Sequence, residues 1–249
     1  MKYKHIISLG SFCSPALEIE RFGFRDFSYP FDWVLSKSFM SVLKLIQTNF
    51  EDFIPDELYQ VEDARYIYVN KKMNIWFVHD FDEWSPLCEQ IEVVRDKYAR
   101  RIQRFNEAIR QETIFLRYIE NNDELNYVNE NYSSIRNYLR TYNKENEIIF
   151  IANFDLKRTN DFEIPIYYVY KDIDDSVARS FLNQLPQLVE MLYECYYSKE
   201  AIKNNSNFYK KKIKKKRVIK INRKIKKIKY LLKGKREYQH FLIYKGDKY

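Results

Sequence analysis

The chain has 249 residues, 45% of them apolar, which is enough for one sizeable hydrophobic core or for one domain with an appendage. It holds no run of 18 apolar residues and no basic segment leading into a long apolar stretch, which argues against a membrane-spanning helix and a secretory signal. Three widely spaced cysteines and three scattered histidines argue against a disulfide framework and a zinc site. They favour a reducing, cytoplasmic location and a protein without a bound cofactor.

Charge is distributed unevenly along the chain. Residues 210–249 hold 18 Lys and Arg against 2 Asp and Glu, a net charge of +16. This leaves 25 basic and 33 acidic residues, a net charge of −8, in residues 1–209. Because the two parts differ so much, we expect them to have different roles. The composition predicts an α/β domain over 1–197, a polar linker over 198–209 and a basic helical extension over 210–249.

The first half of the chain reads as a strand followed by helices and a strand pair. Ser14 is a good helix N-cap, Pro15 suits the first helical position, and Gly23 suits a helix end. Apolar residues at helical or alternating spacing mark the other elements. In chain order we expect a strand over 3–9, a helix over 14–22, an aromatic loop over 24–36, a helix over 37–48, paired strands over 64–69 and 74–81, and a helix over 86–111.

The second half alternates apolar strands with amphipathic helices. The expected order is a strand over 113–119, a helix over 123–142, strands over 147–154 and 164–170, and a helix over 174–196. Buried strands separated by helices are typical of parallel sheets. The pattern predicts an α/β fold with a mostly parallel central sheet and helices on both faces.

The basic extension has an apolar stripe. Val218, Ile221, Ile225, Ile228 and Leu232 step by three and four residues, which places them on one face of a helix otherwise covered by Lys and Arg. Such a helix suits an anionic membrane surface, which residues 210–236 would contact from the cytoplasmic side. The alternative is that the stripe packs on the body. Nucleic-acid binding is not favoured, because no helix-turn-helix or RNA-stacking motif accompanies the charge.

Cys13 stands between the first strand and the first helix. In α/β sheets, reactive groups gather beyond the carboxyl ends of parallel strands. Unpaired N–H groups at a helix start lower the pKa of a cysteine, and together with the backbone from Gly10 to Ser14, including Ser11, they suit an oxyanion. The position therefore predicts a thiolate nucleophile. The alternative is a small buried apolar residue, as free cysteines often are.

His79 is the candidate partner base because it ends a strand and titrates near neutral pH. Asp80 or Asp82 would orient the ring, with Asp32 as a rival, although Asp80 is awkward because adjacent strand residues face opposite ways. The alternative is a strand-end histidine bonded to backbone. Asp155 is a further rival for orienting the ring, His5 lies inside the first strand, and His240 lies in the basic extension.

Three blocks of sequence carry a resemblance: "SLGSFCSPALEIERFGFRDFSYPFDWV", then "FVHDF", then "KYARRIQRF". Over roughly residues 5–155 the chain resembles a bacterial family of unknown function described as papain-like cysteine peptidases, whose members often accompany enzymes of surface-polysaccharide biosynthesis. The resemblance implies a dyad of Cys13 and His79. Papain-type enzymes carry their histidine ~130 residues or more beyond the cysteine. The interval here is 66 residues. The resemblance thus implies a shared dyad more than a shared fold.

Further residues suggest a substrate site. Arg100, Arg101 and Arg104 lie within two turns of one predicted helix, and arginine pairs with phosphate or carboxylate. They suit an anionic substrate such as a sugar nucleotide or the phosphates of coenzyme A; the alternative is a solvated helix face. Phe31 and Trp33 suit stacking on a sugar, although packing aromatics are commoner. With Ser11, Ser14 and Asp82 these side chains complete the candidate substrate-binding set.

Three functions fit these patterns. The first is a thiol hydrolase, most simply a peptidase acting on a peptide substrate. The second is a cysteine-dependent acyltransferase of surface-polysaccharide assembly, which would use the same dyad and acyl-coenzyme A as co-substrate on an acylated or glycan substrate. The third is a non-catalytic binding or scaffold protein.

Overall fold

The computed structural model describes residues 3–156, 164–170 and 181–196. All of them belong to the first of two compact units, Met1–Tyr197. The predicted linker and basic extension lie outside the described residues, so their structure and the membrane contact stay predictions. The first part of the predicted helix over 174–196 also lies outside them.

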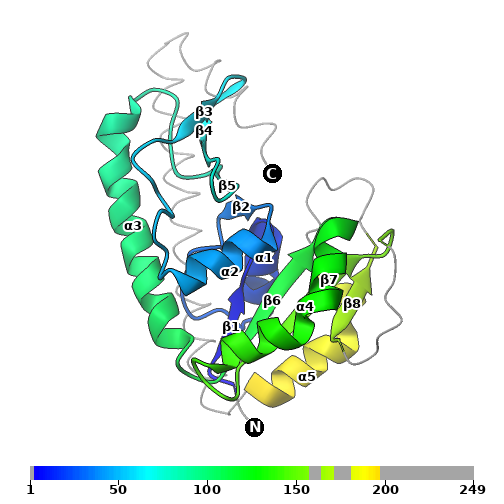
Figure 1. The fold of residues 1–249 in the computed structure, drawn as a ribbon. Coiled ribbons are helices and arrows are strands. Elements are labelled where there is room, and N and C mark those ends of the chain that lie inside the picture. The colour runs from blue at the N-terminus through cyan, green and yellow to red at the C-terminus, as the bar shows by residue number, and fades with distance from the viewer. Residues whose placement is uncertain (1–2, 157–163, 171–180, 197–249) are drawn as a thin grey trace, which may run out of the picture. The chain divides into compact units, whose positions relative to one another are not determined.

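The central sheet has four strands, β1 (His5–Ser8), β6 (Thr113–Ile119), β7 (Glu147–Asn153) and β8 (Ile166–Val169). They stand in the order β1-β6-β7-β8 and every pair is parallel. Parallel neighbours need crossover connections, and Figure 1 shows helices and a second sheet filling those connections. The predicted α/β fold is confirmed.

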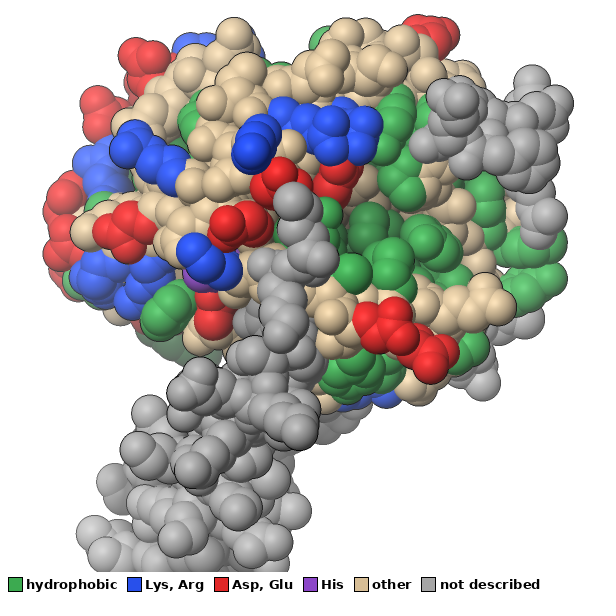
Figure 2. Space-filling model, turned by 90° about the horizontal axis from the view of Figure 1, so that it is seen from below, with side chains coloured by type: hydrophobic (Ala, Val, Ile, Leu, Met, Phe, Trp, Pro, Cys, Tyr) green, Lys and Arg blue, Asp and Glu red, His purple; other side chains and the backbone are tan. Residues whose placement is uncertain are grey.

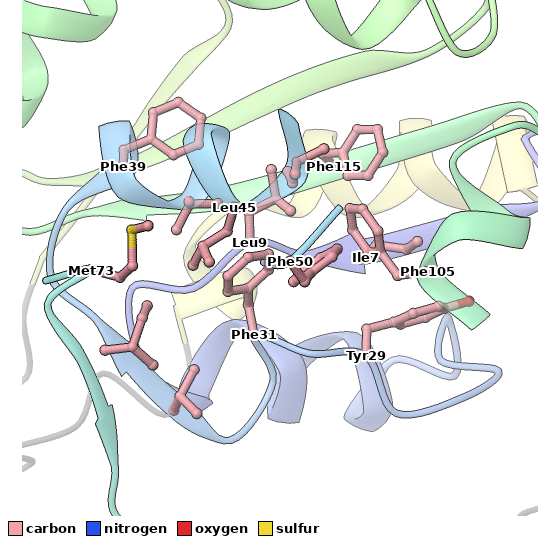
Figure 3. Close-up of a cluster of buried hydrophobic side chains, with 14 of the residues drawn as sticks. Ile7, Leu9, Tyr29, Phe31, Phe39, Leu45, Phe50, Met73, Phe105 and Phe115 are labelled. Carbon is pink, nitrogen blue, oxygen red and sulfur yellow. The ribbon is translucent and has the colours of Figure 1, made fainter. Parts of the chain in front are cut away.

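Helices cover both faces of the central sheet, because successive residues of a strand point to opposite sides. One face packs against α2 (Phe39–Gln47), α3 (Leu87–Ala108) and α4 (Asn122–Arg140). Figure 3 shows Ile7, Leu9 and Phe115 from this face packed with Leu45 and Phe105 from the helices. The other face packs against α1 (Cys13–Arg21), a 3-10 turn (Phe181–Gln184) and α5 (Pro186–Tyr196).

A second, antiparallel sheet is inserted between α1 and α3. It has the order β2-β5-β4-β3, formed by β2 (Val34–Ser36), β3 (Tyr59–Val61), β4 (Ala64–Asn70) and β5 (Ile75–Phe77). The predicted strand pair is confirmed as β4 and β5, joined by a turn in which the Asn70 side chain accepts a hydrogen bond from the Met73 N–H (3.1 Å). The two short strands β2 and β3 were not expected from the sequence.

The start of α1 differs from the prediction. The helix begins at Cys13, and the extended Phe12 (φ −140°) takes the N-cap position, so the prediction of Ser14 as N-cap is wrong. Pro15 becomes the third helical residue, which is tolerated because N–H groups of the first turn have no intrahelical partner. The helix end was predicted correctly, since Gly23 follows it with a positive φ of 83°.

Candidate active site

The loop that carries Cys13 is shaped by Gly10. This residue has φ +90°, and a Cβ there would lie 2.1 Å from the Ser36 Oγ and 2.8 Å from an Arg117 nitrogen, so no other side chain fits. The next residue is tied to the second sheet, because the Ser36 N–H donates to the Ser11 carbonyl (2.6 Å). The Gly10 carbonyl accepts from the Tyr118 N–H of β6 (2.9 Å). The loop is thus clamped between the two sheets.

Arg117 is the anchor of this clamp. It stands in the middle of β6 with no exposed surface. Its guanidinium donates to both carboxylate oxygens of Glu124 (2.7 and 3.0 Å). Its other hydrogen bonds reach the Leu9 carbonyl, the Ser36 hydroxyl and the Ser36 carbonyl, each at 2.8 Å. These five bonds match the five N–H groups of arginine, so a fully satisfied buried cation joins β1, β2, β6 and α4.

Arg117 was not predicted from the sequence. The available signal was a single cation inside the apolar run "TIFLRYI", followed seven residues later by Glu124 near a predicted helix start. A charge at the centre of a fully buried strand is rarely tolerated without a partner.

Cys13 is a partly buried free thiol at the first position of α1. The N–H groups of Cys13 and Ser14 have no intrahelical partner, since they stand in the first turn, and the Phe12 side chain provides no cap for them. The hydroxyls of Ser11 and Ser14 are buried and find no hydrogen-bond partner within the described part of the chain. The N–H groups at the helix start suit a negatively charged oxygen beside the sulfur.

The ionisation of Cys13 differs from the prediction. Burial, and after it the Asp32 and Asp80 carboxylates, raise the pKa of the thiol from 9.0 to about 11; the contact with its own backbone N–H acts in the opposite direction but is weaker. The expected lowering by the helix start is therefore wrong. Desolvation and two nearby negative charges both disfavour a thiolate, so the resting site holds a neutral thiol.

His79 lies just beyond β5 with an exposed side chain. Val34 of β2 pairs with Phe77 of β5, and two residues further out on each segment stand Asp32 and His79. Asp32 and Asp80 are the two carboxylates that act on the Cys13 thiol. The segment that bears His79 therefore runs close to Cys13. A direct contact between the sulfur and the imidazole stays a prediction.

The acidic residues near Cys13 are held by other partners. Asp80, with 3% of its side chain exposed, accepts hydrogen bonds from Lys97 and from the Tyr98 hydroxyl (2.8 Å). Asp32 accepts from the Arg25 guanidinium (2.6 Å) and the Tyr29 N–H (2.8 Å). Burial raises the pKa of Asp32 to about 6, against the opposing effect of Arg25. Both carboxylates thus fix the surrounding chain, and their predicted role in orienting His79 stays a prediction.

Two other acidic residues lie in loops. Asp82 accepts from the N–H groups of Trp84 (2.9 Å) and Ser85 (2.8 Å), which lower the pKa of this carboxyl. These contacts order the turn before α3, which gives Asp82 a structural role. Its contact with substrate stays a prediction. Asp155 is exposed in the turn after β7.

The aromatic pair of the "PFDW" stretch divides between core and surface. Phe31 is fully buried and packs against Phe50, Phe53 and Phe105, so stacking of a sugar on it is excluded. Trp33 is half-buried, and the Arg25 guanidinium lies over its ring (4.9 Å to the centroid).

The three predicted arginines divide between two places. Arg101 lies over the Tyr98 ring (4.8 Å) and lowers the pKa of Asp32, so it belongs to the surroundings of Cys13. Arg100 and Arg104 line a cavity of about 400 Å³ with His5 and Tyr29, and Cys13 is not among its lining residues. The structure therefore does not bring the three arginines together at one site.

No three His, Cys, Asp or Glu side chains within the described residues stand close enough to hold a metal ion together. None of the described helices is both long and apolar enough to cross a bilayer.

The fold and the site define a parallel α/β protein with a cysteine at the head of the helix after its first strand. The profile of the family described as "Putative papain-like cysteine peptidase (DUF1796)" matches residues 4–155, which include Cys13, His79 and Arg117. The chain belongs to this family, and the resemblance predicted from its sequence is confirmed.

The curated relative it matches is an uncharacterized protein, R408, of Acanthamoeba polyphaga mimivirus. The two are 32% identical over 122 residues, which cover 40% of this chain and 53% of the viral protein. The chain thus matches about half the length of that relative. No solved structure matches the chain.

Proposed function

We propose that the chain is a thiol hydrolase, most simply a peptidase, in which Cys13 is the nucleophile and His79 the acid and base. One observation carries the proposal: the Asp80 carboxylate, next to His79 in sequence, acts on the Cys13 thiol, so the segment that bears His79 runs close to the sulfur. The description of the family as cysteine peptidases supports the same chemistry.

The neutral resting thiol determines how the reaction would begin. Because burial raises the pKa of Cys13 to about 11, the proton must leave while the sulfur attacks the acyl carbon. His79 accepts this proton, and the N–H groups of Cys13 and Ser14, with the hydroxyls of Ser11 and Ser14, donate to the carbonyl oxygen as it becomes negative. His79 then protonates the departing amine as its bond to carbon breaks. Water attacks the thioester, which releases the acid and restores the thiol.

Acyl transfer from p-nitrophenyl acetate to the full-length chain tests this proposal. We expect a burst of nitrophenol and an acetyl group on Cys13, located by mass spectrometry. His79→Ala should slow acetylation about 100-fold or more, since a positioned base contributes ~10²–10⁴.

Cys88 provides a matched control, because it is an exposed thiol at the start of α3. Acetylation of Cys13 that is no faster than that of Cys88, and unchanged by His79→Ala, would contradict the proposal. Loss of the acetyl group to water supports a hydrolase. Release only to an added amine or hydroxyl acceptor, with acetyl-coenzyme A as an effective donor, would instead identify the acyltransferase.

The second candidate function is a non-catalytic binding role, and one observation favours it. A thiol with a pKa of about 11 is almost entirely protonated at neutral pH, as in cysteines that serve as small buried residues. In this case Cys13→Ser would leave the cellular function intact.

A further inference from the structure

The cavity that Arg100 and Arg104 line lies at the other end of β1 from Cys13. His5 begins the strand and Cys13 follows its carboxyl end, so about 13 Å of extended chain separates His5 from Leu9 alone. The cavity has a volume of about 400 Å³, in the range of small-molecule sites. Its walls come from β1, from the loop after α1 and from the second half of α3.

His5 is the fixed element of this cavity. Its Nδ1 is hydrogen-bonded to Asp26 (2.5 Å), and the Tyr29 hydroxyl donates to both oxygens of the same carboxylate (3.0 and 3.1 Å). With Nδ1–H donating to Asp26, the ring presents Nε2, which is buried and has no hydrogen-bond partner among the described residues. A buried polar atom in this state is unfavourable unless something fills the place beside it.

The remaining wall is cationic. Arg100 and Arg104 are four residues apart and share one side of α3. Within the described ranges neither of them forms an ion pair, whereas Arg95 on the same helix pairs with Asp56 and Glu92. Glu107 also lines the cavity, but its carboxylate accepts from Gln103 (3.0 Å) and offsets only one of the two guanidinium charges. Figure 2 shows Lys and Arg side chains interspersed with Asp and Glu on the α3 side of this end of the molecule.

We propose that this cavity binds the phosphate group of a small organic molecule, at a site separate from Cys13. In its monoanionic form a phosphate monoester offers two oxygens that accept from Arg100 and Arg104 and one P–OH group that donates to the unprotonated Nε2 of His5. The cavity exceeds the size of the phosphate itself, and the rings of Phe27 and Tyr29 supply an apolar wall for a carbon skeleton. The Arg104 guanidinium already lies over the Phe27 ring (5.5 Å).

The test follows binding at the cavity itself, because the Lys-rich residues 210–249 of the full chain also attract phosphate. Full-length protein carrying ring-labelled histidine is titrated with inorganic phosphate and with phenyl phosphate, and the His5 signal, assigned with His5→Gln, is followed by NMR. We expect a saturable shift of this signal and tighter binding of phenyl phosphate. Arg104→Gln and Arg100→Gln should each weaken binding about tenfold, the worth of one charge-assisted hydrogen bond.

Matched variants keep the test specific. Arg95→Gln removes a charge from the same helix outside the cavity, and Cys13→Ser alters only the candidate active site; both should bind as the wild type does. The proposal fails if the His5 signal does not saturate, if Arg104→Gln titrates like the wild type, or if Arg95→Gln weakens binding equally. Because Cys13 takes no part, failure of the thiol hydrolase would leave this outcome unaffected.

Discussion

The Arg117 anchor and the Cys13 loop that it holds in place differ in how their buried polar groups are paired. Around the anchor every guanidinium N–H has an acceptor, although the partners come from positions 7, 81 and 108 residues away in sequence. Around Cys13 the hydroxyls of Ser11 and Ser14 are buried without partners in the described structure. The first arrangement satisfies every buried donor, whereas the second leaves two hydroxyl donors without an acceptor inside the described chain.

This difference suggests where stability and activity reside. Substitutions in the anchor should strongly destabilise the fold, because they leave charges and carbonyls buried and unpaired. Substitutions of the unpartnered hydroxyls should change reactivity and leave stability nearly unaltered.

The largest effect is expected for Arg117→Met. The variant leaves Glu124 buried without its cation and removes the donors to Leu9 and Ser36, which should lower the free energy of unfolding by about 3–5 kcal/mol. Urea denaturation followed by circular dichroism measures this loss. The control Arg136→Met removes a half-exposed pair with Glu147 (35% and 24% exposed) and should cost ~0–1 kcal/mol. Similar losses for both would show that the anchor is no more important than a surface ion pair.

A smaller loss is expected for Gly10→Ala. The new Cβ would meet the Ser36 Oγ and would have to adopt a positive φ, so we expect a loss of about 1–3 kcal/mol. A double-mutant cycle with Ser36→Ala separates the two causes, because removal of the hydroxyl relieves the nearest clash and leaves the backbone strain. If Gly10→Ala costs as much in the Ser36→Ala background, the close approach does not limit this position.

These two positions show how far the sequence could be read. Alternation and helical spacing predicted the strands of the central sheet and most helices, because one buried face imposes a regular pattern. Gly10 and Cys13 were placed at a strand end by the same reasoning. Arg117 and the short strand β2 were missed, because their stability depends on partners far away in sequence. The raised pKa of Cys13 was missed for a similar reason, since burial and the approach of Asp80 arise only in the folded chain.

A moderate effect is expected for Asp80→Asn, which removes one of the two charges that raise the pKa of Cys13. In a background where Cys88 and Cys195 are serine, the pH midpoint of iodoacetamide alkylation of Cys13 should be lower with Asp80→Asn than with Asp80. Asp82→Asn is the matched control, because Asp82 is not among the groups that act on Cys13. An unchanged midpoint in Asp80→Asn would show that the Asp80 carboxylate does not act on the Cys13 thiol, and the reason for placing the His79 segment near Cys13 would be lost.

The same thiol makes stability depend on pH in the alkaline range. Its pKa is higher in the folded chain, about 11, than the usual 9.0, so the folded state retains this proton where the unfolded chain loses it. The contribution of Cys13 to stability is therefore fully present below pH 9 and is lost as the pH rises toward 11. Cys13→Ala should reduce the fall in the urea midpoint between these pH values, and an identical fall in both proteins would contradict the assignment.

The smallest effect on stability is expected for Ser14→Ala. Unlike the anchor substitutions, this variant should change reactivity and leave stability nearly unaltered. The Ser14 hydroxyl has no partner within the described chain, so its removal should change the free energy of unfolding by less than ~1 kcal/mol, or raise it. Acetylation of Cys13 by p-nitrophenyl acetate should nevertheless slow about tenfold or more, because a donor to the developing oxyanion is lost. Unfolding and acetylation are measured on one preparation. A large loss of stability would place Ser14 with the anchor, whereas unchanged acetylation would show that its hydroxyl does not face the reacting carbonyl.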